Sequence, residues 1–131
     1  MSARKPATPR PTDAELAILT VLWGRGPCTV REVQEALAEQ KPTQYTTALK
    51  LLQIMAEKGL VRRDERARAH RYRASRPREW TQRQLAGDLL QRAFQGSAKS
   101  LMLGALSAHK ASQEELAEMR RLLDEYKGDE R

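Results

Sequence analysis

The stretch LVRRDERARAHRYRASRPR, residues 60–78, decides the fold that we expect for this chain. It contains eight arginines and only two acidic residues, Asp64 and Glu65. It directly follows Gly59, which is well placed to end a helix in the left-handed conformation. A compact cluster of cations just after a helix is typical of a surface that meets a phosphate backbone, so nucleic-acid binding is the first hypothesis.

The pattern inside this stretch predicts a β-hairpin. Residues 60–63 and 69–73 form the two predicted strands, and the turn falls near residues 65–68. Val61 and Tyr72 are the side chains expected to point inward.

Three helices are predicted before the hairpin. Capping boxes at Thr12–Glu15 and Thr29–Glu32 mark the starts of the first two, and the second ends near Gln40. Gly24-Arg25-Gly26-Pro27 ends the first helix, whose apolar stripe contains Leu16, Leu19 and Trp23, widened by Ile18 and Leu22. The third runs over residues 44–58, and its predicted buried positions are Tyr45, Ala48, Leu49, Leu52, Met55 and Ala56.

Three helices followed by a basic hairpin form a winged helix-turn-helix. In that arrangement the third helix enters the major groove of duplex DNA and the wing follows the backbone. Short polar groups and one lysine lie opposite the apolar face of the third helix, and cations line the wing. The predicted DNA-binding residues are Thr43, Gln44, Thr46, Thr47, Lys50, Arg63, Arg68, His70 and Arg71.

Beyond Pro77 the sequence is helical again, with a break at Gly96-Ser97 and a third capping box at Ser112–Glu115. Helices totalling roughly 45 residues bury too little apolar surface by themselves. A second copy of the chain is the simplest partner, since a two-fold dimer pairs like stripes; folding back onto the winged helix is the alternative. The predicted dimer residues are Trp80, Leu90, Phe94, Leu101, Leu116, Met119, Leu123 and Tyr126.

We therefore predict a mainly α fold with a small β-hairpin wing, in which a winged helix-turn-helix precedes a C-terminal helical dimerisation region. The predicted segments are a disordered basic arm over 1–11, a DNA-binding domain over 12–75, a dimerisation domain over 76–127 and a tail over 128–131.

Composition narrows the class of protein. The net charge is +7, and its surplus is concentrated in residues 1–12 and 60–78. The N-terminus lacks the apolar core of a signal peptide and no apolar run suits a bilayer, so we expect a cytoplasmic protein without a membrane partner. A single cysteine, Cys28, fits a reducing compartment and is expected to be buried rather than reactive. His70 and His109 lie in different segments without a nearby ligand set, so we expect no enzyme, metal or cofactor.

Several short motifs, in this order, resemble the penicillinase-repressor family. They are Thr12-Asp13-Ala14-Glu15 with Leu22-Trp23, Tyr45-Thr46-Thr47, Glu57-Lys58-Gly59-Leu60-Val61 and Arg68-Ala69-His70-Arg71-Tyr72. The resemblance covers roughly residues 12–126. It implies a homodimeric winged-helix repressor that occupies inverted-repeat operators, with Thr46, Thr47 and Lys50 facing the bases and Arg68, His70 and Arg71 on the wing.

The chain also departs from this family's pattern. Relatives often have arginine or lysine at the position of Ile54. Some relatives are inactivated by a sensor protease that cuts an Asn-Phe bond, but the matching bond here is Gly104-Ala105, which argues against that partner. Copper-responsive relatives have a C-terminal cysteine cluster, whereas this chain has no cysteine after Cys28.

Two other classes of function remain open at this point. A winged helix can serve as a protein-interaction adaptor without sequence-specific DNA binding, although the basic wing argues against it. A regulator that binds a small effector between its helices is the third hypothesis, for which the sequence offers few aromatic residues and no evident polar cluster.

Overall fold

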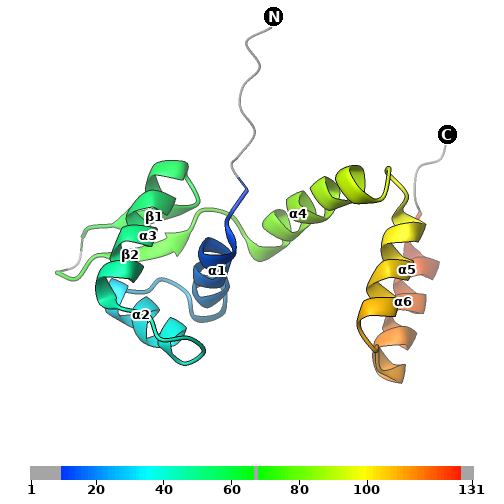
Figure 1. Cartoon of the computed structure of the whole chain (residues 1–131), viewed down its shortest axis with the longest axis horizontal. Coiled ribbons are helices and arrows are strands. Elements are labelled where there is room, and N and C mark those ends of the chain that lie inside the picture. Colours follow the sequence, from blue (N-terminus) through cyan, green and yellow to red (C-terminus); the bar gives the residue numbers. More distant parts are fainter. Residues whose placement is uncertain (1–9, 67, 128–131) are drawn as a thin grey trace, which may run out of the picture. The chain divides into compact units, whose positions relative to one another are not determined.

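The computed structural model describes residues 10–66 and 68–127 (Figure 1). The first three helices precede an antiparallel hairpin, and three more helices follow it. The helices are α1 (Asp13–Arg25), α2 (Val30–Ala38), α3 (Tyr45–Lys58), α4 (Arg78–Ala93), α5 (Ala98–Ala108) and α6 (Gln113–Glu125); the strands are β1 (Val61–Asp64) and β2 (Arg71–Ala74).

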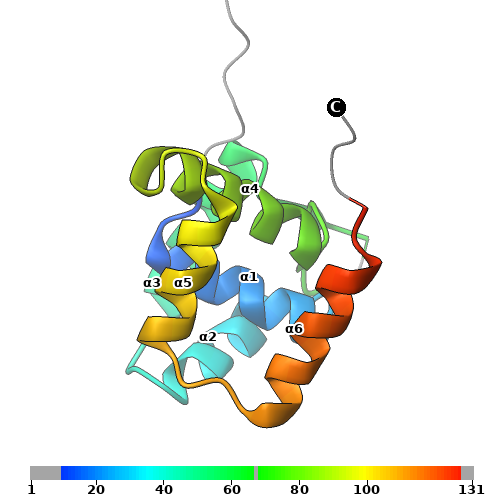
Figure 2. The same cartoon turned by 90° about the vertical axis from the view of Figure 1, so that its right-hand side faces the viewer.

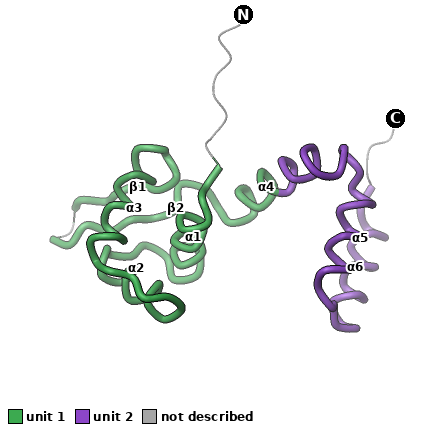
Figure 3. The backbone as a smooth tube through the Cα atoms, viewed as in Figure 1, with its two compact units in different colours: residues 1–85 green, residues 86–131 purple. Residues whose placement is uncertain are grey.

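The chain divides into two compact units, Met1–Leu85 and Ala86–Arg131, so that α4 contributes to both (Figure 3). The first unit contains α1 to α3, the hairpin and the first half of α4. The second contains the end of α4 with α5 and α6. The functional division predicted at residue 76 lies just before α4 and stays a prediction.

The core of the first unit lies between α1, α2, α3 and the hairpin. It is aliphatic, and Ile18, Val33, Ala48, Leu52 and Met55 have no measurable exposure to solvent. The stripe predicted for the first helix is therefore centred on Ile18, Leu19 and Leu22, while Leu16 and Trp23 are only half-buried.

The predicted hairpin is confirmed, one residue later than expected on β1 and one to two on β2. Its register pairs Val61 with Ala74 and Arg63 with Tyr72. Val61 and Tyr72 are buried, as predicted. Cys28 forms an isolated antiparallel bridge with β2. Its amide donates to the Tyr72 carbonyl at 3.0 Å, and its carbonyl accepts the Tyr72 amide at 2.8 Å. The hairpin is thereby attached to the segment between α1 and α2.

Two predictions for α3 are wrong. Tyr45, expected in the core, is 43% exposed, and Ala56 is also exposed. Tyr45 lies in the first turn, beyond the reach of the core side chains, and its ring lies under the Arg31 guanidinium, 5.6 Å from the ring centroid. Ala56 lies beside the buried face formed by Ala48, Leu52 and Met55, not on it.

The second unit lacks a buried core within the described residues. No side chain of α5 or α6 is fully buried, and Leu103, Leu122 and Leu123 are each more than half exposed. α5 and α6 diverge from the segment that joins them (Figure 2). Gly104 of α5 packs near the Phe94 side chain, because a Cβ added at this glycine would lie 3.4 Å from the Phe94 ring.

A buried ion pair joins the beginning of α1 to the end of α3. Glu15 is only 2% exposed, and Lys58 donates hydrogen bonds to both of its carboxylate oxygens, at 3.1 and 2.8 Å. The same carboxylate accepts the Thr12 amide at 2.9 Å and completes the capping box. Burial alone raises the pKa of Glu15, but hydrogen bonds from Lys58 and the Thr12 amide, together with the Lys58 charge, outweigh it and lower the pKa from its usual value.

Replacing Lys58 with methionine should destabilise the first unit by about 3 kcal/mol near neutral pH, because the Glu15 charge then stays buried without its partner; the value is at the low end for a buried pair because the Lys58 side chain is 31% exposed. The pKa of Glu15 is lowered by folding, so the contribution of the pair is present above the unfolded-state pKa and is lost as pH falls through the folded-state pKa. The measurement is urea unfolding from about pH 7 down to about pH 3.

The matched control is Glu57→Gln, which changes an exposed charge on the same helix. A Lys58→Met variant as stable as the Glu57→Gln variant at neutral pH would contradict the role assigned to this pair.

Candidate nucleic-acid interface

The exposed face of α3 presents a polar stripe. Thr46, Lys50 and Gln53 follow one another at helical spacing, and all three are exposed. Thr47 lies exposed beside this stripe. The predictions included Thr46, Thr47 and Lys50 but not Gln53, which the same i, i+4, i+7 spacing identifies. An amide, a hydroxyl and an ammonium on one helical face can reach base edges in the major groove.

The N-terminus of α3 differs from the other helix starts for which a cap is defined. α1, α2, α5 and α6 are each preceded by an N-cap threonine or serine whose hydroxyl accepts an early amide. The N-cap of α3 is Gln44, whose side chain forms no capping hydrogen bond. Its first amides therefore remain available for an anionic oxygen, as at helix termini that bind phosphate.

Thr43 holds the segment before α3 in place. Its hydroxyl donates to the Lys41 carbonyl at 2.8 Å, and its carbonyl accepts the Gln34 side chain at 3.1 Å. Thr43 is half-buried. These bonds fix the turn between α2 and α3 and so set where the polar stripe of α3 begins.

The outer face of the hairpin brings two arginines directly opposite each other. The register pairs Arg62 with Arg73, and both side chains are exposed. Like charges at paired positions of a sheet repel. A phosphate placed over this face would relieve that repulsion. Neither arginine was among the predicted DNA-binding residues, because only the strand register reveals that they face each other.

Acidic residues pair with other wing arginines. Arg66 binds Asp64 through its guanidinium at 2.9 and 3.0 Å and through its amide at 3.0 Å, which lowers the pKa of Asp64 to about 2. Glu65 pairs with Arg63. Asp64 thus closes the turn of the wing, and Arg63, although a predicted DNA-binding residue, is partly neutralised.

Arg71 ties the wing to α2. Its guanidinium lies 3.2 Å from the Glu32 carboxylate, which also accepts the Thr29 amide of the second capping box. The Thr29 amide and, to a smaller extent, the Arg71 charge lower the pKa of Glu32. Arg71 therefore positions the wing as well as adding charge to it.

Arg68 and His70 are the predicted wing residues that remain fully available. Both are exposed, and within the described residues neither forms an ion pair. The structure therefore brings the predicted residues of α3 and the wing into one compact unit. It distinguishes the arginines that hold the wing together from those open to a ligand.

The last two arginines of the basic stretch lie outside the hairpin. The Arg76 guanidinium lies 4.6 Å from the centre of the Trp80 ring, and that of Arg78 lies 5.9 Å from Trp23. The Trp23 indole donates to the Arg76 carbonyl at 2.9 Å. These interactions fix the start of α4 against α1, so Trp80 already has partners within the first unit.

The remaining predicted dimer residues all lie in the second unit, which includes the end of α4. Leu90, Phe94, Leu101, Leu116 and Met119 are half-buried, whereas Leu123 and Tyr126 are 59% and 76% exposed. Leu123 on α6 and Tyr126 directly after it are therefore the predicted dimer residues most open to another surface.

Neither thiol chemistry nor a metal cluster is indicated in the described residues. Cys28 is buried, and burial raises the pKa of its thiol, with a smaller contribution from the Glu32 charge. Within residues 10–66 and 68–127, no group of three or more His, Cys, Asp or Glu side chains is arranged to hold a metal ion. None of the described helices has the length and apolarity needed to span a bilayer.

Comparison with known proteins gives consistent matches. The sequence model described as "Penicillinase repressor" matches residues 11–125. Two curated relatives, both named "Transcriptional regulator BlaI" and from the CDC 1551 / Oshkosh and H37Rv strains of Mycobacterium tuberculosis, are 46% identical over 61 residues, 46% of this chain. The match spans only 44% of each relative's length.

A solved structure also matches, that of the Bacillus licheniformis BlaI monomeric form in complex with the blaP half-operator. It is 22% identical, with a TM-score of 0.49, and covers 56% of this chain and 89% of that one.

Proposed function

The chain belongs to the penicillinase repressor family, and we propose that it is a sequence-specific DNA-binding transcriptional repressor that acts as a homodimer on an inverted-repeat operator. The curated relatives matched over 61 residues are named transcriptional regulators, which supports the regulatory part of this proposal. The site geometry supports the DNA-binding part.

The juxtaposition of α3 with the wing is the observation that carries the proposal. An uncapped helix N-terminus and an exposed polar stripe belong to the same compact unit as a hairpin with opposed Arg62 and Arg73. The helix supplies groups that read base edges, and the wing supplies cations for the backbone. In this assignment Gln44, Thr46, Thr47, Lys50 and Gln53 act from the helix; Thr43, Arg63, Arg68, His70 and Arg71 complete the set.

The exposed apolar residues of the second unit support the homodimer. Leu122 and Leu123 on α6, and Tyr126 directly after this helix, are each more than half exposed in the described chain. A two-fold dimer would bury them against their own copies. It would also place two α3 helices at half-sites one helical turn apart, or a multiple of it, which requires an inverted repeat.

Removing charge from the wing should weaken binding to all duplexes alike. In Arg62→Gln/Arg68→Gln, both substituted arginines lack an ion pair among the described residues, so folding should be unaffected. The slope of log affinity against log salt should become less negative by about 0.9 for each phosphate that the wing no longer neutralises. Fluorescence anisotropy at several salt concentrations measures both effects.

The control is Arg92→Gln/Arg120→Gln, which changes the net charge equally but lies outside the first unit. If the wing variant kept the affinity and salt slope of this control, the wing would not touch the backbone.

Substitutions on α3 should instead change the order in which DNA sequences are preferred, as measured by their binding affinity. Each good base contact contributes about 1–3 kcal/mol of discrimination, so Thr46→Val should reduce the preference for the best operator while leaving weak, non-specific binding unchanged. Lys50→Gln should also reduce that preference and, because it removes a cation, should weaken non-specific binding as well. The operator is first selected from a random duplex library with the wild-type chain, and competition assays then compare the variants.

Lys99→Gln on α5 is the matched control for Lys50→Gln. Failure of the wild-type chain to enrich any sequence would favour the protein-interaction adaptor over the repressor.

Leu123→Glu should convert the dimer to monomer, because a charge would then lie in an apolar seam. Leu123 is already exposed in the protomer, so the fold itself should tolerate the change. Sedimentation velocity measures the shift, and Leu103→Glu on α5 is the control, since Leu103 is similarly exposed but outside the predicted seam. A Leu123→Glu variant that remains dimeric would place the seam elsewhere, for example along Trp80, Leu90 and Phe94.

A further inference from the structure

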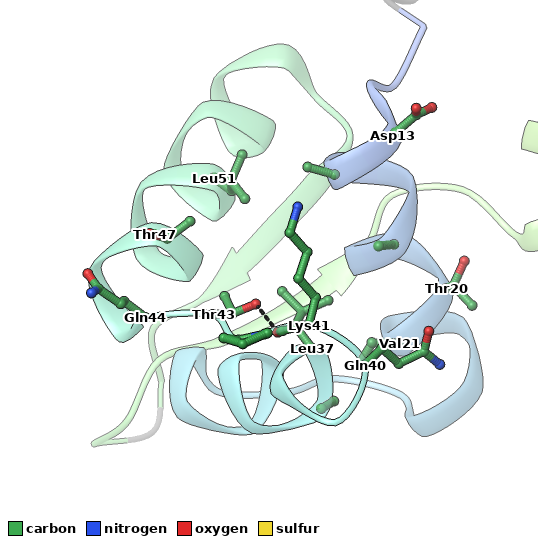
Figure 4. Close-up of a pocket in the computed structure, with 14 residues that line it drawn as sticks. Asp13, Thr20, Val21, Leu37, Gln40, Lys41, Thr43, Gln44, Thr47 and Leu51 are labelled. Atoms are coloured by element: carbon green, nitrogen blue, oxygen red, sulfur yellow. Dashed lines mark hydrogen bonds between the residues drawn. The ribbon is translucent and has the colours of Figure 1, made fainter.

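An open groove of about 1000 Å³ lies between α1, α3 and the connection that follows α2 (Figure 4). Its apolar lining includes Ala14, Ala17 and Val21 from α1, Leu37 from α2 and Leu51 from α3. The volume is in the range of small-molecule sites. The whole groove belongs to the first unit.

A single lysine extends into this groove. In Figure 4 the Lys41 side chain reaches between α1 and α3, while the Asp13 carboxylate at the rim is directed away from it. Lys41 forms no ion pair among the described residues. Its position is fixed by its backbone, because its amide donates to the Leu37 carbonyl at 3.1 Å and its carbonyl accepts the Thr43 hydroxyl at 2.8 Å.

We propose that this groove binds an amphipathic carboxylate, with a hydrocarbon chain against the apolar walls and the carboxylate on Lys41. Apolar walls are poor surroundings for a bare phosphate, which needs several polar partners. A free ammonium beside those walls disfavours a cationic ligand and favours an anionic one. A hydrocarbon acid satisfies both conditions with one molecule.

The groove shares residues with the candidate DNA interface. Thr43, Gln44 and Thr47 line it and also belong to the predicted DNA-binding set. A ligand bound there would occupy the flank of α3 near its uncapped N-terminus. In consequence, and resting on the proposed function, an acid bound in the groove lowers the affinity for DNA.

The test uses the full chain and decanoate below its micelle concentration, without DNA. Nuclear magnetic resonance titration should show saturable shifts at Ala17, Val21, Leu37 and Leu51. Lys41→Gln should weaken binding about tenfold, since a charge-assisted hydrogen bond is removed. Ala17→Trp should abolish it by filling the groove from an exposed helical position. 1-Decanol should bind more weakly than decanoate, and Lys110→Gln should have no effect.

Several outcomes would overturn the proposal. They are shifts confined to Leu122 and Leu123, binding that survives Ala17→Trp, or decylamine binding as tightly as decanoate. The proposal would also be wrong if the same resonances shifted when residues 1–9 were deleted or when the ligand-free protein was diluted. The first result would mean that residues 1–9 cover the groove, and the second that another copy of the chain covers it. Circular dichroism verifies that the variants are folded.

The effect on DNA is measured separately, by adding decanoate to the anisotropy assay with wild type and Ala17→Trp. Because ligand binding is measured without DNA, a chain that binds the acid but no duplex would refute the repressor function and leave the groove assignment intact. A chain that binds duplex but no acid would do the reverse.

Discussion

The carboxylate of Glu15 holds the first unit together. It caps α1 through the Thr12 amide and accepts the ammonium of Lys58 from the last turn of α3. Glu32 repeats this arrangement at α2, where it closes a capping box and accepts Arg71 from the wing. In both cases the third residue of a helix satisfies local amides and also anchors a distant element. The orientations of α3 and of the wing therefore depend on two glutamates at helix starts.

This arrangement leaves a specific set of groups unsatisfied. Acids neutralise Arg63, Arg66 and Arg71 within the molecule, whereas Arg62 and Arg73 face each other across the strands. α3 keeps its first amides uncapped while four other helices use theirs. Donors and cations fixed in place before a ligand arrives need little reorganisation to bind it. The opposed arginines of the wing and the uncapped amides of α3 are therefore available to an anionic group.

The second unit has exposed apolar side chains and, on α5 and α6, no fully buried residue. Its helices carry leucines at regular spacing, yet none reaches the burial of the core side chains in the first unit. Apolar surface of this kind becomes stable when it is removed from water by another surface. The exposed groups of the two units therefore differ in kind: those of the first include opposed arginines and uncapped amides, and those of the second are apolar side chains.

Local features of this chain were predictable from sequence. The capping boxes at Thr12 and Thr29, the end of α3 at Gly59 and the inward side chains Val61 and Tyr72 depend on neighbours within a few residues, and the structure confirms them. At Ser112 the hydroxyl caps α6 as expected, although only that half of the capping box forms in the described helix.

Tertiary structure alone decided which charges pair and which remain open. Glu15 and Lys58 are 43 residues apart, and Glu32 and Arg71 are 39 apart. The exposure of Tyr45, the opposition of Arg62 and Arg73 and the groove around Lys41 likewise arise where separate elements meet. Helical periodicity and capping act over one or two turns, whereas ion pairing and burial depend on distances that only the packed chain sets.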